Sequence, residues 1–164
     1  SLLLDWWVLD AEDPEWQELP MQLREELQTK DEAGDAQDSR YDPLLAIALA
    51  YRHRGMSNDY LLRKARSLGI EVDEVSGEPE PMEACPCCLY LVSDERGGYG
   101  ICPVCFWEDD GLRILDMYSP PNRATLREGR MRFAALERGS SGDYGATRVN
   151  LRDAYPRSAQ DVVR

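Results

Sequence analysis

Four of the five cysteines form two closely spaced pairs, and this spacing constrains the fold more than any other feature of the chain. Cys85 and Cys88 are separated by two residues, as are Cys102 and Cys105, and thirteen residues lie between the two pairs. A C-x2-C turn places two sulfur atoms on one side of a tight loop, and two such turns complete a tetrahedral shell of four thiolates. The sequence therefore predicts one metal site with these four ligands, with the two turns at the ends of a β-hairpin.

Zinc is the default ion for a shell of four thiolates. Because four sulfur ligands fill the coordination sphere, no position is left for water or a substrate, and the ion has a structural rather than a catalytic role. We therefore expect one structural Zn²⁺ per chain. Two alternatives remain: iron in the same shell, as in rubredoxin, would make the protein a one-electron carrier, and four reduced cysteines could simply pack together.

The fifth cysteine, Cys87, lies between two of the expected ligands. A single tetrahedral ion has no fifth position for its sulfur. We expect Cys87 to be a partly buried thiol that binds no metal, and an exchanged ligand or a redox-sensitive thiol are the alternatives.

The distribution of helix signals and cysteines predicts an α+β fold, with a helical N-terminal part and a zinc-ribbon-like C-terminal module. Residues 71–83 carry six acids and no base, together with one glycine and two prolines, which is typical of an extended linker. The expected parts are an acidic, helical part over 1–76, the zinc-ribbon-like module over 84–139 and a C-terminal tail over 140–164.

The sequence predicts helices at four places, and the first of them begins at Asp13-Pro14. Asp42 and Pro43 open an apolar run, since Asp is a good N-cap and Pro fits the first helical turn. Ser57 caps the next helix after a short glycine turn, so we expect residues 42–70 to form a helical hairpin. The apolar positions of residues 125–137 predict a further helix inside the module.

The net charge of −12 restricts the kind of partner, because it repels nucleic acid and anionic lipid. The acids are concentrated in residues 1–38, which hold twelve acids and two bases. The sequence contains no run of 18 apolar residues that could span a bilayer. An odd number of cysteines, crowded together, favours metal binding in a reducing compartment. We therefore expect a cytoplasmic protein with a basic protein partner and no membrane contact.

Catalytic motifs are missing from the sequence. His53 is the only histidine, and neither a phosphate-binding loop nor a dinucleotide fingerprint is present. With 31 acids, a pair of carboxylates can always be found, so such a pair carries no information. We therefore expect the protein not to be an enzyme.

Five bases between Tyr51 and Leu68 support a different reading, in which the two helices of 42–70 contact DNA. These bases are Arg52, Arg54, Arg63, Lys64 and Arg66. Against this reading stands the overall negative charge, and the same bases could pair with the acidic N-terminal segment. A zinc-ribbon regulator that binds nucleic acid, or a structural adaptor, is therefore the alternative function.

Residues 85–139 resemble the cysteine-rich CPCC family of small bacterial proteins. The resemblance lies in the two cysteine turns, the string from Phe106 to Asp110, and Pro121-Asn122 ahead of the last expected helix. The chain departs from the family at Leu89, where a glycine is usual, and at Pro120, where a Gly-Pro pair is usual.

Members of this family occur with polymorphic toxin systems, so the resemblance implies an immunity protein that inhibits a cognate secreted toxin. A basic nuclease or a similar effector would suit the charge of the chain, since acidic side chains can mimic phosphate and steer association. We expect the N-terminal acids beside an aromatic anchor to bind this partner, and the acids after Trp107 to form a second patch. The expected residues are Glu12, Asp13, Glu15, Trp16 and Glu18 in the first patch, and Glu108, Asp109 and Asp110 in the second.

Overall fold

The computed structural model describes residues 9, 11–29, 37–137 and 149–161. Its contacts divide the chain into two compact units, residues 1–54 and 55–164. The described residues contain helices and two small antiparallel sheets, which confirms the α+β class. The expected boundary between an N-terminal part and the module lay further along, at the linker 71–83.

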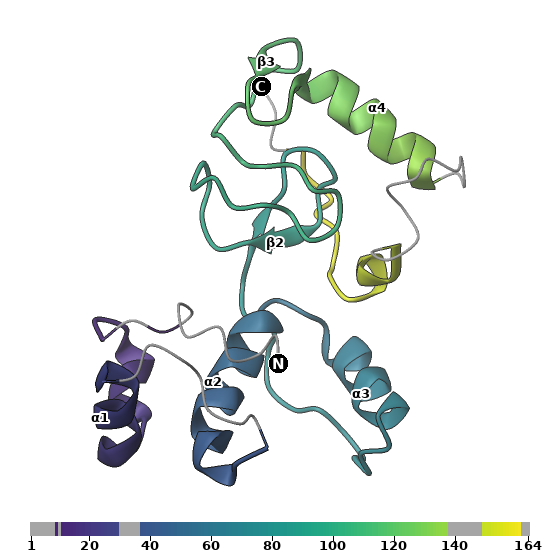
Figure 1. The fold of residues 1–164 in the computed structure, drawn as a ribbon. Coiled ribbons are helices and arrows are strands. Elements are labelled where there is room, and N and C mark those ends of the chain that lie inside the picture. The colour runs from purple at the N-terminus through teal and green to yellow at the C-terminus, as the bar shows by residue number, and fades with distance from the viewer. Residues whose placement is uncertain (1–8, 10, 30–36, 138–148, 162–164) are drawn as a thin grey trace. The chain divides into compact units, whose positions relative to one another are not determined.

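Within the described residues of the first unit, the regular elements are helices (Figure 1). It contains the 3₁₀ helix η2 (Pro14–Glu18), α1 (Met21–Thr29), the 3₁₀ helix η3 (Ser39–Tyr41) and α2 (Asp42–Arg52). Pro14 and Pro43 lie in the first turns of η2 and α2, as the fixed φ of proline favours. Among the described residues of this unit, the buried side chains are Trp16, Leu19, Leu23, Tyr41 and Leu44.

The second unit is an α+β module (Figure 1). Its helices are α3 (Asn58–Ser67), α4 (Leu126–Glu137) and the 3₁₀ helix η4 (Val149–Asp153). Strand β1 (Glu83–Ala84) pairs with β2 (Leu91–Ser93), and β3 (Tyr118–Ser119) pairs with β4 (Ala124–Thr125), both antiparallel. The two helices expected to form one hairpin, α2 and α3, therefore belong to different units.

Helix α4 begins at a reciprocal cap and packs on the cysteine turns. The Glu128 amide N–H donates to Thr125 Oγ1 at 3.2 Å, and the Thr125 amide N–H donates to Glu128 Oε2 at 2.8 Å. Further along the helix, the ring of Phe133 packs edge to face against the ring of Tyr90, with ring centroids 6.3 Å apart. The helix expected over 125–137 is thus confirmed at 126–137.

The C-terminal segment 154–161, called the strap here, lies against β2 and α3 of the same unit. The Leu91 amide donates to Pro156 O at 2.9 Å, and the Ser158 amide donates to Leu89 O at 2.8 Å. The Ser57 amide donates to Ala154 O at 2.8 Å. The strap, in yellow in Figure 1, is therefore part of the module although it was expected to lie in a separate tail.

None of the helices in the described parts of the chain has the length and the apolar run that crossing a membrane requires.

Candidate metal centre

The two cysteine turns are repeats of one backbone loop, 17 residues apart. In the first turn the Cys85 amide donates to Tyr90 O, and in the second the Cys102 amide donates to Trp107 O, both at 2.9 Å. The loop-closing bonds, from the Leu89 amide to Cys85 O and from the Phe106 amide to Cys102 O, are also both 2.9 Å long. The sequence repeat is therefore a structural repeat, in which each turn presents its two sulfurs in the same way.

Both turns need a left-handed residue directly after their second cysteine. Leu89 has φ +67° and Phe106 has φ +64°. Glycine adopts this conformation without steric cost, whereas a side chain with a β-carbon is strained there. The departure from the family pattern at Leu89 thus leaves the turn geometry unchanged, at the cost of backbone strain.

The strands lie at a different place from the one expected. We expected a hairpin to connect the two turns, but each turn is instead the tip of its own short hairpin. Strands β1 and β2 flank the first turn, and an isolated bridge between Ile101 and Glu108 flanks the second. The difference arises because each turn closes its own antiparallel bonds, such as the one from the Asp109 amide to Gly100 O at 3.0 Å.

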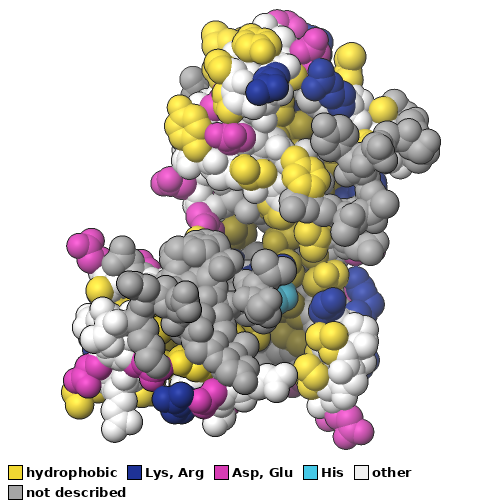
Figure 2. Space-filling view, viewed as in Figure 1, with side chains coloured by type: hydrophobic (Ala, Val, Ile, Leu, Met, Phe, Trp, Pro, Cys, Tyr) yellow, Lys and Arg dark blue, Asp and Glu magenta, His cyan; other side chains and the backbone are white. Residues whose placement is uncertain are grey.

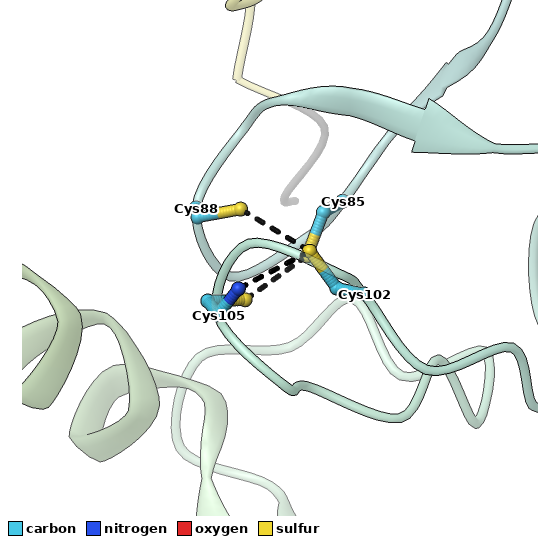
Figure 3. A group of neighbouring side chains, drawn as sticks. All are labelled: Cys85, Cys88, Cys102 and Cys105. Atoms are coloured by element: carbon cyan, nitrogen blue, oxygen red, sulfur yellow. Dashed lines mark hydrogen bonds between the residues drawn. The ribbon is translucent and has the colours of Figure 1, made fainter. Parts of the chain in front are cut away.

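The four sulfurs predicted as ligands come together from the two turns (Figure 3). They all lie within 4.8 Å of one another, and the pairs Cys85–Cys105 and Cys88–Cys102 are each 3.6 Å apart. Zn–S bonds of about 2.3 Å in a tetrahedron place neighbouring sulfurs about 3.8 Å apart. The donor set therefore fits a single tetrahedral ion, and these residues form a possible metal site.

Backbone amides point at one of the sulfurs in a site that is largely buried. The amides of Val104 and Cys105 point at Cys102 Sγ, at 3.4 and 3.5 Å. Cys85, Cys88 and Cys102 are buried, and Cys105 is half-buried. Such amides and a bound cation stabilise thiolates, which burial alone disfavours.

The thiols also influence one another. Hydrogen bonds with Cys102, Cys105 and Cys88 lower the pKa of the Cys85 thiol. The hydrogen bond with Cys102 is the main cause that raises the pKa of Cys88, and it also raises the pKa of Cys105. Negative charge on one sulfur thus opposes ionisation of its neighbours, so four thiolates require a cation between them.

Cys87 lies outside the group of four sulfurs. It is buried in the core of the second unit, near the helix α4. A β-carbon added at Gly129 would lie 3.4 Å from Cys87 Sγ and only 2.6 Å from the ring of Trp107. Gly129 therefore allows α4 to approach both side chains closely.

The second expected partner patch is largely occupied inside the module. Asp109 is buried and pairs with Arg113, while Asp110 accepts hydrogen bonds from Ser119 Oγ at 2.7 Å and from the Leu112 amide at 3.2 Å. The Glu108 amide donates to Asn122 Oδ1, and Asn122 Nδ2 donates to the Glu108 carbonyl, both at 2.8 Å. Asp109 is thus buried rather than a surface contact, and the contacts of residues 108–110 lie within the module.

In the first expected patch, the tryptophan is buried and most of the acids are exposed. Trp16 is 7% exposed and belongs to the core of the first unit, so it is no exposed anchor. Glu12, Glu15 and Glu18 are exposed and Asp13 is half-buried. On the face that Figure 2 shows, acidic side chains (magenta) are spread over the surface rather than gathered in one patch.

Three residues that position the site were missed by the sequence reasoning. Arg113 pairs with Asp109 in a non-helical segment, where a spacing of four residues predicts no salt bridge. Asn122 contacts the backbone of Glu108, 14 residues away, and Arg130 contacts that of Pro86, 44 residues away. No local sequence pattern predicts such contacts.

Comparison with known proteins finds a family model that matches most of the module. Residues 83–155 match the family model described as Cysteine-rich CPCC. No curated protein and no solved structure gives a match. The matched range extends past the expected end at 139 and takes in part of the strap. The match confirms the expected resemblance of this part of the chain to the cysteine-rich CPCC family.

Proposed function

We propose that the module binds one structural Zn²⁺ through Cys85, Cys88, Cys102 and Cys105. The observation that carries the proposal is the closed set of four sulfurs at tetrahedral spacing. The ion would bridge two turns, of which the first has strands of two and three residues and the second has an isolated bridge. With no open coordination position, zinc would hold a scaffold and contact no substrate.

Elemental analysis of the purified protein tests the metal. About one zinc per chain is expected, and a strong chelator should lower the stability of the second unit. A red protein with iron in its place would contradict the zinc proposal and favour an electron carrier.

We further propose that the protein is a non-enzymatic, cytoplasmic immunity protein that binds and inhibits a cognate toxin with a basic surface. The support is the charge of −12 together with the exposed carboxylates of the first unit. In η2 the three-residue period of a 3₁₀ helix sets Glu15 and Glu18 on one face, while Trp16 and Leu19 face the core. A rigid helix would thus present these carboxylates to a basic partner, which raises the association rate.

The partner test uses the protein encoded beside this chain as the probe. A triple variant, Glu12→Lys, Glu15→Lys and Glu18→Lys, should weaken its binding more at low salt than at high salt, because salt screens exposed charges. The matched control is the triple variant Glu71→Lys, Glu74→Lys and Glu78→Lys, which makes the same charge change in the exposed linker. Equal effects of the two variants would remove the first unit from the interface.

A zinc-ribbon regulator that binds nucleic acid, or an adaptor, is the alternative. Some of the bases behind that alternative have partners in the structure: Arg63 pairs with Asp59, and Arg66 donates to the carbonyls of Val72 and Asp73. Specific binding of duplex DNA at physiological salt would favour the regulator over the immunity protein.

A further inference from the structure

The guanidinium of Arg130 connects the first cysteine turn with the C-terminal strap. From α4, Nε and Nη2 donate to the carbonyl of Pro86 at 3.0 and 2.7 Å. The same group pairs with Asp161, through Nη1 to Oδ2 and Nη2 to Oδ1, each at 2.7 Å. One side chain thus joins three segments that are far apart in sequence.

The contact between Arg130 and Pro86 lies beside the metal site. Pro86 is fully buried and stands directly after Cys85, so its carbonyl is part of the loop that presents two of the four sulfurs. The side chain of Arg130 is 21% exposed, which makes its hydrogen bonds less subject to competition from water than those of a surface arginine. Movement of Arg130 would therefore move the ligand loop.

The two turns differ in this respect although their backbones repeat. Pro103 is the counterpart of Pro86, and within the described ranges no side chain donates a hydrogen bond to its carbonyl. The second turn is held instead by Asn122 on the backbone of Glu108. Among the described residues, hydrogen bonds join the first turn, and not the second, both to α4 and to the strap.

Charge gives a second reason for an arginine at this place. Four thiolates around one divalent ion leave two negative charges in a largely buried site, and a nearby cation stabilises them. The planar fork of arginine donates to the carbonyl and to both oxygens of the carboxylate at once, and the compact ammonium of a lysine does not match this bidentate geometry. Asp161 in turn fixes the orientation of the fork.

We propose that Arg130 is a positioning residue of the metal centre, which holds the Cys85–Cys88 turn ready for zinc and couples metal retention to docking of the strap. The inference rests on the proposed zinc site. Because coupling is reciprocal, zinc should also stabilise the docked strap. Two strap contacts, Ser158 on Leu89 and Leu91 on Pro156, flank the same turn and would transmit the effect.

The test compares zinc affinity in the full chain, measured by competition with a chromogenic chelator. Arg130→Gln should weaken zinc binding about 10- to 100-fold, as the loss of residues that support metal ligands does elsewhere. Asp161→Asn should weaken it less, and the double variant should lose less than the sum of both effects, since the two residues act together. The matched control is Arg127→Gln on the same helix, whose partner Asp116 is exposed and contacts neither turn. It should leave the affinity unchanged.

Two further readouts separate positioning from general destabilisation. The Co²⁺-substituted protein should show altered d–d bands in Arg130→Lys, which keeps the charge but loses the fork, while its circular dichroism stays that of the wild type. The Ser158 amide should exchange faster in Arg130→Gln, and in the wild type it should exchange faster after zinc is removed. If Arg130→Gln does not fold, Arg130→Lys and Asp161→Asn carry the test.

The possible failures are distinguishable. A wild-type chain that binds no zinc overturns the zinc site and this inference together. Zinc binding by the wild type with the same affinity in the Arg130 and Asp161 variants overturns the inference alone. Loss of affinity in Arg127→Gln equal to that in Arg130→Gln overturns it as well, since the effect would then belong to any charge on α4.

Discussion

Asp109 and Arg113 form a bidentate ion pair beneath the surface of the module, with Arg113 Nη1 and Nη2 donating to Asp109 Oδ1 and Oδ2 at 2.7 and 2.8 Å. The side chains are only 6% and 17% exposed. The Asp109 backbone also belongs to the second turn, because its carbonyl accepts from the Tyr99 amide at 2.9 Å. The pair therefore supports the hairpin that carries Cys102 and Cys105.

Replacing Asp109 should destabilise the protein rather than weaken a partner contact. Asp109→Asn leaves the half-buried Arg113 without its carboxylate, and breaking a buried pair costs about 3 to 5 kcal/mol. Denaturant unfolding of the metal-loaded protein measures the loss. Asp116→Asn is the control, since its pair with Arg127 is exposed and should change stability little. Wild-type stability in Asp109→Asn would show that the pair contributes nothing.

The left-handed residues after each cysteine turn predict that glycine is better than alanine at these positions. Leu89 and Phe106 both have positive φ, where a β-carbon costs about 1 kcal/mol or more. Leu89→Gly should therefore be more stable than Leu89→Ala by about 1 kcal/mol, and the same order should hold at Phe106. Comparing glycine with alanine removes the effect of losing the side chain beyond its β-carbon.

Ile101 provides the control for this comparison, because it is 62% exposed and is not among the positive-φ residues. There the order should reverse, with alanine more stable than glycine, since glycine loses more backbone entropy on folding. Thermal unfolding of the six variants gives both orders. Alanine above glycine at Leu89 would contradict the strain.

Replacing Gly129 even by alanine is expected to destabilise the protein. Alanine favours helices over glycine by about 1 kcal/mol, so Gly129→Ala would stabilise an unobstructed helix. In α4 the added β-carbon would lie 2.6 and 2.8 Å from two ring carbons of Trp107, which is too close. We expect a net loss of about 1 to 3 kcal/mol from overpacking. Met131→Ala on the exposed side of α4 should have little effect, and unfolding measurements on both variants decide the matter.

The ligand set could be predicted from sequence because it depends on local spacing. Two residues between cysteines fix the geometry of a turn, and the repeat of that turn fixes the second half of the site. The Thr125 and Glu128 cap and the Ser57 cap are equally local, which is why the starts of α4 and α3 were foreseen.

The supports of the site could not be predicted because they depend on contacts between distant segments. Arg130 reaches Pro86 from 44 residues away, and the strap reaches Leu89 from the far end of the chain. Asp109 was taken for a surface acid because an acidic string is typical of solvent-exposed residues. Its burial follows from the Arg113 side chain, whose direction a sequence does not show. The acids expected to bind a partner in the first unit remain a prediction.

Cys87 and Cys88 are neighbours in sequence, yet they should respond differently to the same substitution. Cys88 Sγ lies 3.6 Å from Cys102 Sγ within the group of four, whereas Cys87 lies outside that group and near α4. Cys88→Ser should therefore lose most of the bound zinc, because a hydroxyl is a poor replacement for a thiolate ligand. Cys87→Ser should keep about one zinc per chain and lose a little stability from the buried hydroxyl. Zinc content after dialysis measures both variants, and a loss of metal in Cys87→Ser equal to that in Cys88→Ser would make Cys87 a ligand.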